Sequence, residues 1–163
     1  MSDCRIRKKV IIAAALTILI AIVAAAFFFH YGSGTLVIEN VKTSQIYKRF
    51  RLHEGDTFSI GFVHSVNKTP VTDYYELRKD GIYVVKTVYY SFGAGEQTEI
   101  EEGQTLEYGE DGSMIVTGFN KKIDDLIYFV GTVSDHTLVV NEKETISLRD
   151  LCGRNAMVRF RWK

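Results

Sequence analysis

Residues 57–90 read TFSIGFVHSVNKTPVTDYYELRKDGIYVVKTVYY and carry the clearest structural signal of the chain. Apolar and polar side chains alternate along them, and the alternation is interrupted around Pro70 and again at Asp80-Gly81. A period of two residues is typical of a half-buried β-strand, and Asp-Gly is a favoured hairpin turn because glycine tolerates a positive φ. The stretch therefore predicts three consecutive strands of an antiparallel sheet.

The same alternation recurs on both sides of this stretch, from Thr35 to Trp162. It gives about nine or ten short strands, with turns at the spacing of about 8–12 residues that is typical of sandwiches and barrels. One helical turn is expected around Leu148–Leu151, ended by Gly153. The sequence therefore predicts an all-β sandwich or barrel of short antiparallel strands.

The N-terminal region predicts one transmembrane helix. Residues 10–29, VIIAAALTILIAIVAAAFFF, carry no charge, and a helix of this length spans the hydrocarbon core of roughly 30 Å. A basic cluster precedes them, and positive residues beside a membrane segment favour the cytoplasmic side. We therefore expect a cytoplasmic basic tail over 1–9, a single-pass anchor over 10–29, a linker over 30–34 and an extracytoplasmic β domain over 35–163.

An alternative is a cleaved signal peptide, because Ala24–Ala26 offers a small-residue cleavage site, and the domain would then be secreted. In the anchored topology Cys4 and Cys152 lie on opposite sides of the membrane and cannot pair within one chain. Neither lies in a spacing typical of zinc ligands, so we predict no metal and no cofactor. After residue 9 the chain has 16 basic and 19 acidic residues and no basic stripe, which argues against nucleic-acid binding.

His64 and Ser65 end the first strand of the opening stretch. Neighbouring residues of a regular strand point to opposite faces, so the two side chains are not expected to form a nucleophile–base pair. His64 falls in phase with Phe58, Ile60 and Phe62, on the predicted core side. It is expected either to bond to a backbone carbonyl or carboxylate, or to line a pocket and bind an anion when protonated. For Ser65 a turn hydroxyl is favoured over a nucleophile.

Two further features accompany His64. Asp73 and Glu76 lie on opposite faces of the next strand, and either could orient the imidazole across the Pro70 loop, although a solvent-facing charge is favoured for Glu76. Residues 91–95, SFGAG, allow the backbone to approach a ligand closely, and successive amides could cradle an anion. A glycine turn that closes a strand explains the same residues, and no helix follows to suggest a nucleotide site.

Together, HSVNKTPVTDYYEL and YYSFGAG resemble a bacterial and archaeal family of small exported or anchored proteins with a domain of unknown function. The resemblance covers roughly Thr35 to Trp162, with DHTLVV and AMVRFRW similar to its closing strands. Either Asp73 or Glu76 matches the acidic position, and Glu96 departs from the family because members often have an apolar residue there. The other matching positions are His64, Ser65, Val66, Pro70, Ser91, Phe92, Gly93, Ala94 and Gly95.

Members of this family are often encoded beside, or fused to, TRAP-type permeases that use TAXI-type solute-binding proteins. The resemblance therefore implies an accessory role in uptake of a small anionic solute, with the permease or its solute-binding protein as partner, and it implies no known reaction. We expect a non-enzymatic accessory protein that binds or docks through the two motifs. The alternatives are a small-ligand-binding module or hydrolase that uses His64, Ser65 and an acid, and a structural cell-surface β module.

Overall fold

The computed structural model describes residues 14–23, 32–66, 68–91 and 100–163. The chain divides into two units, Met1–Ser33 and Gly34–Lys163, and residues 14–23 of the first unit are helical. Within these described ranges, no helix is long and apolar enough to cross a membrane. The predicted anchor over 10–29 extends beyond the described residues at both ends, as does the proposed cleavage site, so both remain predictions.

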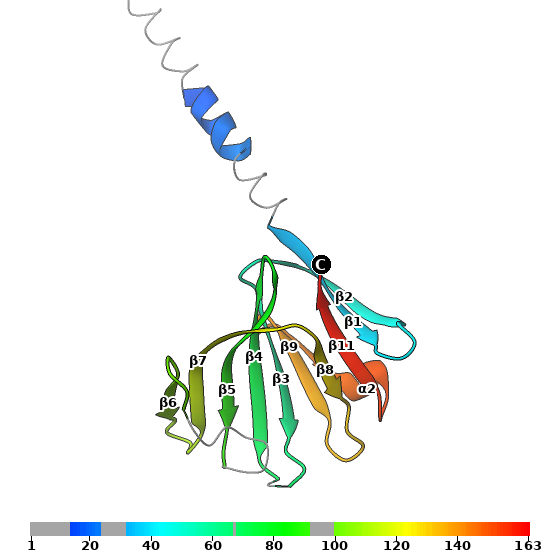
Figure 1. Cartoon of the computed structure of the whole chain (residues 1–163). Coiled ribbons are helices and arrows are strands. Elements are labelled where there is room, and N and C mark those ends of the chain that lie inside the picture. Colours follow the sequence, from blue (N-terminus) through cyan, green and yellow to red (C-terminus); the bar gives the residue numbers. More distant parts are fainter. Residues whose placement is uncertain (1–13, 24–31, 67, 92–99) are drawn as a thin grey trace, which may run out of the picture. The chain divides into compact units, whose positions relative to one another are not determined.

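The described part of the second unit forms eleven strands and one short helix (Figure 1). An all-β domain is confirmed, with slightly more strands than the sequence pattern predicts. The elements are β1 (Ser33–Asn40), β2 (Ile46–His53), β3 (Thr57–Val63), β4 (Pro70–Arg78), β5 (Gly81–Tyr89), β6 (Thr105–Tyr108), β7 (Met114–Ile123), β8 (Leu126–Phe129), β9 (His136–Val140), β10 (Glu144–Ser147), α2 (Leu148–Cys152) and β11 (Met157–Trp162).

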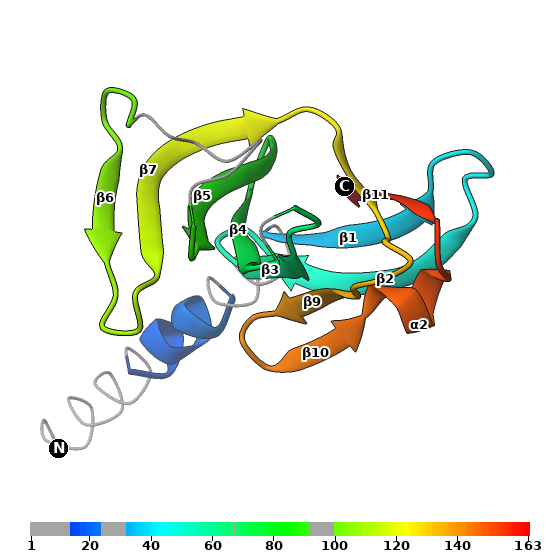
Figure 2. The same cartoon turned by 90° about the horizontal axis from the view of Figure 1, so that it is seen from below.

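The strands form two antiparallel sheets. The small sheet has the order β2-β1-β11-β8, and the large sheet has the order β10-β9-β3-β4-β5-β7-β6. Figure 2 shows that the large sheet curves strongly from β10 to β6. The opening stretch of the sequence supplies β3, β4 and β5, which are neighbours in the large sheet and antiparallel, as predicted.

The inner faces of the two sheets enclose one principal apolar core. Phe58 of β3 stacks on Phe160 of β11, with ring centroids 5.7 Å apart, and on Tyr75 of β4 at 5.0 Å. Ile60 and Leu138 of the large sheet are fully buried in the same cluster. Both sheets contribute to this cluster, so the domain is a two-layer sandwich, one of the two architectures that the strand pattern predicts.

The helical turn predicted near residue 148 is present as α2. The hydroxyl of Ser147 accepts the Asp150 N–H at 3.0 Å, which caps the first turn. Gly153 follows the last turn with a φ of 85° and donates its N–H to the Arg149 carbonyl. A glycine in this conformation ends a helix at little steric cost, so the element stops where the sequence indicates.

The prediction that β3 continues in phase through His64 is wrong, because β3 ends at Val63. The His64 N–H donates to the Thr69 carbonyl at 2.9 Å, and the Lys68 N–H donates to the His64 carbonyl at 3.0 Å. Lys68 has a φ of 57°, in the left-handed region that turns use. These two bonds close a tight loop between β3 and β4, so alternation along a strand no longer determines where His64 points.

We expect Phe58→Ala to lower the free energy of unfolding by about 3–5 kcal/mol, because it opens a cavity where the two sheets meet. Urea unfolding followed by the fluorescence of Trp162, the single tryptophan, measures the change. Phe129→Ala serves as the control, since Phe129 is 55% exposed and its loss is expected to stay within about 0.5 kcal/mol. Equal losses in the two variants would contradict the prediction.

Candidate functional site

Segments that are distant in the sequence meet at one end of the sandwich, which we call the loop end. It comprises the β3–β4 loop, Tyr90 and Ser91 after β5, the β8–β9 loop, and the start of α2. Thr69 and Ser91 share a hydroxyl hydrogen bond of 3.0 Å, and the Ser134 hydroxyl donates to the Val63 carbonyl at 3.2 Å. In Figure 1 the β3–β4 and β8–β9 loops form the lower edge of the domain.

His64 is half-buried in the β3–β4 loop, whereas Ser65 is exposed. The Val66 N–H donates to His64 Nδ1 at 3.3 Å, so this nitrogen is an acceptor and the neutral ring carries its proton on Nε2. Within the described residues, Ser65 makes no hydrogen bond to the imidazole. The arrangement therefore provides no serine nucleophile with an adjacent base, and the reason is the turn rather than strand alternation.

The two acidic candidates have different surroundings. Asp73 lies on the inner face of β4 and accepts hydrogen bonds from Thr87 and Tyr128. Glu76 forms an ion pair of 2.9 Å with Arg78 and lies roughly 20 Å from the start of β4, counted along the strand. The contacts of Asp73 link it to the interior rather than to His64, and Glu76 lies far from the loop end.

The described residues of the two sequence motifs lie close together. Pro70, the first residue of β4, is the cross-strand partner of Val63 and is exposed. The bond between Thr69 and Ser91 joins the first motif, at the residue before Pro70, to the second motif. Phe92, Gly93, Ala94 and Gly95 lie outside the described residues, so their proposed part in the site remains a prediction.

Beneath the loop end lies a polar cluster that connects the two sheets. Tyr128 of β8 donates to Asp73 Oδ2 at 2.6 Å, and the hydroxyls of Tyr75 and Tyr128 are 2.6 Å apart. Thr87 donates to Asp73 Oδ1 at 2.8 Å. Burial, together with the nearby Asp73 charge, raises the pKa of both tyrosines, so both phenols remain protonated. Because Tyr128 donates to the carboxylate, its oxygen is left to accept from Tyr75.

His136, the first residue of β9, lies next to this cluster and is only 8% exposed. Its ring stacks on Phe62 with centroids 5.2 Å apart, and Tyr128 meets it edge-on at 5.9 Å. Nδ1 is buried and has no hydrogen-bond partner among the described residues. Burial lowers the pKa of His136, although the neighbouring Asp135 opposes this effect, so the imidazole is neutral at pH 7.

Asp135 anchors the β8–β9 loop to α2. Its carboxylate accepts hydrogen bonds from the Ser147 hydroxyl, the Arg149 N–H at 3.0 Å and the His136 N–H at 2.7 Å. Burial acts to raise the pKa of this carboxyl, but the three hydrogen bonds together lower it. The loop is therefore held in place by an ionised carboxylate with three donors.

Tyr128 and His136 were not predicted as site residues from the sequence. Each is a polar side chain on a face that is otherwise apolar, and this is the signal that could have identified them. Strand alternation also indicates that the Asp73 side chain lies on the inner face of β4, because Ile60, its cross-strand Cα partner, faces the core. Within the described residues, no group of three or more histidine, cysteine or acidic side chains is placed to hold a metal ion.

The fold and the loop end define a small two-sheet β domain with a buried polar cluster beneath its loops. The family model described as "Domain of unknown function (DUF1850)" matches residues 58–147, and the chain belongs to this family. The match begins in β3 and ends with β10, so it includes Asp73, Tyr128 and His136. No curated protein and no solved structure matches the chain in the two other comparisons.

We expect Tyr128→Phe to lower the free energy of unfolding by about 1.5–3 kcal/mol, because it removes a hydrogen bond to a partly buried carboxylate. Tyr75→Phe removes only a bond between two neutral hydroxyls and is expected to cost about 0.5–1.5 kcal/mol. Urea unfolding at pH 7 compares the two variants. A loss for Tyr75→Phe that equals or exceeds the loss for Tyr128→Phe would argue against the cluster as described.

We expect His136 to make the domain less stable in acid. Because folding lowers the pKa of His136, the contribution of the neutral ring is fully present above about pH 6.5 and is lost as the pH falls below that value. His136→Gln cannot titrate and should remove this part of the pH dependence. Urea unfolding of both proteins at about pH 7.5 and pH 5 measures it, and a difference between them that does not change with pH would contradict the prediction.

Proposed function

We propose that this protein is a non-enzymatic, membrane-anchored accessory protein that docks onto a TRAP-type permease through its loop end. The observation that supports a docking role is the position of the exposed apolar side chains. Val133 is 89% exposed and Val66 is 66% exposed, both in loops at this end. The other large apolar side chains that are exposed there are Val63, Tyr90, Tyr108, Phe129 and Met157.

Strand pairing places these side chains at the same end of both sheets. Tyr108 pairs with Met114, which in turn pairs with Tyr89 at the end of β5. Phe129 pairs with Met157 at the corresponding end of the small sheet. Since exposed apolar side chains at one end of a domain often mark an interaction site, their position supports docking.

The opposite end of the sandwich has a different character. There β1 begins, the chain ends at Lys163, and exposed charged groups predominate. Lys122 pairs with Asp80 at 3.1 Å beside the β4–β5 turn, and Lys79 is also exposed. The exposed large apolar side chains named above are therefore concentrated at the loop end, where exposed charged residues such as Lys68 and Asp111 also lie.

The described side chains give no support to a hydrolase. Ser65 lacks a hydrogen bond to His64, and the Ser91 hydroxyl is engaged with Thr69. Burial raises the pKa of the Cys152 thiol to about 12, so this residue is not a thiolate nucleophile at neutral pH. The alternative of small-ligand binding is supported by a separate observation, the buried Nδ1 of His136. The other alternative, a structural surface module, would need no partner at the loop end.

The choice of a TRAP-type permease rests on the family resemblance and not on the geometry. We expect the full-length chain, purified from membranes, to bring the permease with it. The double variant Val66→Asp/Val133→Asp should reduce recovery at least tenfold, because docking would bury two unpaired carboxylates. Quantitative mass spectrometry of the purified fraction measures the recovery.

Lys79→Asp provides the control, since it adds a carboxylate at the charged end and should leave recovery unchanged. Failure of the wild-type chain to recover the permease, or equal recovery with the double variant, would overturn the proposal. Self-association that is lost in the double variant would instead identify a second copy of the chain as the occupant of the loop end, and this too would overturn docking onto the permease.

A further inference from the structure

Arg149, the second residue of α2, lies beside the most exposed apolar residue of the loop end. Its Nη2 donates to the Val133 carbonyl at 3.1 Å, and its backbone N–H donates to Asp135. The Nε atom is buried and has no hydrogen-bond partner among the described residues. In the part of the chain that the structure describes, no carboxylate forms an ion pair with this guanidinium.

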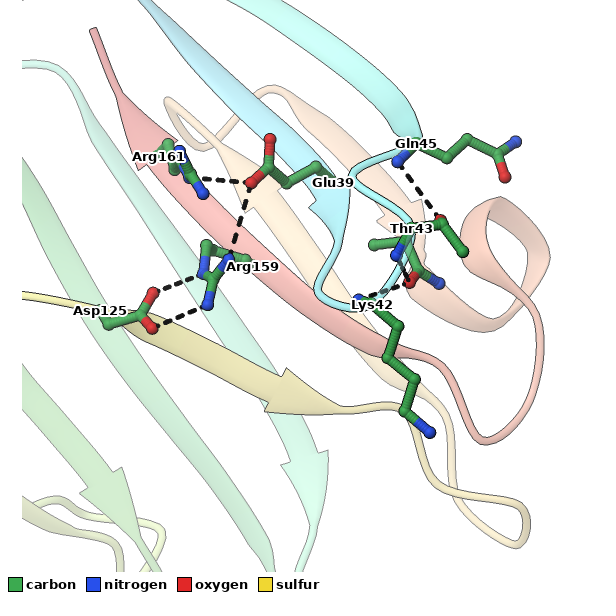
Figure 3. Close-up of polar contacts among 8 residues, drawn as sticks. Glu39, Lys42, Thr43, Gln45, Asp125, Arg159 and Arg161 are labelled. Carbon is green, nitrogen blue, oxygen red and sulfur yellow. Dashed lines mark hydrogen bonds and ion pairs between the residues drawn. The ribbon is translucent and has the colours of Figure 1, made fainter.

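The other partly buried arginines of the described domain have carboxylate partners. Arg159 makes two hydrogen bonds to Asp125, of 2.6 and 3.0 Å, on the outer face of the small sheet, and its guanidinium lies 3.9 Å from Glu39 (Figure 3). Arg78 forms an ion pair with Glu76 at 2.9 Å. Even the more exposed Arg161 approaches Glu39 at 2.8 Å. Arg149 thus differs from arginines in similar surroundings in the same domain.

The Asp135 carboxylate accepts the Arg149 backbone N–H and its charge interacts with Arg149, but it forms no ion pair with the guanidinium. In all, this carboxylate accepts from the Ser147 hydroxyl and two backbone N–H groups, and these bonds fix it toward the start of α2. A partly buried guanidinium without an ion-paired carboxylate is costly, and an external carboxylate would relieve part of that cost. The guanidinium presents a planar fork of donors that matches a carboxylate, so a carboxylate is the anion that fits one arginine.

We infer that Arg149 receives an acidic side chain of the docking partner, which lies between apolar residues that cover Val133 and Val63. This inference rests on the proposed docking role and specifies the chemistry of the partner surface, namely a carboxylate surrounded by apolar side chains. The apolar surroundings exclude water from the ion pair, which strengthens it and gives the contact a defined orientation. The partner is a protein, because a free carboxylate would leave the apolar side chains uncovered.

The test compares Arg149→Gln, Arg149→Lys and Arg154→Gln in the full-length chain, with permease recovery as the readout. Arg149→Gln should weaken docking by about 30-fold or more, because it leaves the partner carboxylate unpaired. Arg149→Lys keeps the charge but loses the fork, so an intermediate loss is expected. Arg154, an exposed arginine just after α2, is the matched control, and its variant should dock like the wild type.

The Arg149→Lys variant also allows a direct chemical readout. A carbodiimide should join the introduced amine to the partner carboxylate, and mass spectrometry of the cross-linked peptide then identifies the acid. We expect this cross-link with Arg149→Lys and not with Arg149→Gln. The backbone bond from residue 149 to Asp135 is retained in all variants, and a thermal midpoint close to that of the wild type verifies that each one is folded.

The outcomes separate this inference from the proposed function. If Val66→Asp/Val133→Asp abolishes docking while Arg149→Gln docks like the wild type, the docking role stands and the carboxylate contact is refuted. A cross-link from the introduced amine to a residue of the same chain would also refute it.

Discussion

The hydrogen bond from Tyr128 to Asp73 is the contact on which the relative position of the two sheets most depends. It joins β8 of the small sheet to β4 of the large sheet at 2.6 Å, whereas the rest of that interface consists mainly of apolar packing such as the stack of Phe58 on Phe160. Apolar packing is non-directional and tolerates sliding, but a partly buried carboxylate must keep its donors or bear a large desolvation cost. The polar contact therefore fixes a register that the apolar core alone would leave loose.

Tyr128 also packs against residues next to the loop end. The Tyr128 ring meets Phe62 at 6.2 Å and His136 at 5.9 Å, both edge-on, so it packs beside the end of β3 and the start of β9. The β8–β9 loop starts just after this residue and returns to Asp135, whose carboxylate holds it against α2. Val66 and Val133 thus project from loops that are tied at both ends, which keeps this part of the surface preorganised.

The sequence pattern predicts those parts of the structure whose physical cause lies within a few residues along the chain. The alternation of Phe58 and Ile60, the Asp80-Gly81 turn and the Gly153 helix end all have a physical cause within a few residues, and each was predicted correctly. The end of β3 was not, because it depends on hydrogen bonds that close the loop from His64 to Thr69. The polar cluster could not be predicted either, since Tyr128 lies 55 residues from Asp73 and belongs to the other sheet.

The described carboxylates of the domain and the Arg149 guanidinium differ in the partners that the domain supplies to them. The domain provides these carboxylates with partners: hydroxyl donors for the half-buried Asp73, hydroxyl and backbone donors for the half-buried Asp135, and an ion pair with Arg161 for the buried Glu39. The guanidinium of Arg149 forms no ion pair among the described residues, although the Asp135 charge acts on it, and it lies where apolar side chains are also exposed. The exposed apolar side chains and the guanidinium without an ion-paired carboxylate both lower the stability of the isolated domain. A partner that brings apolar surface and one carboxylate relieves both costs at once.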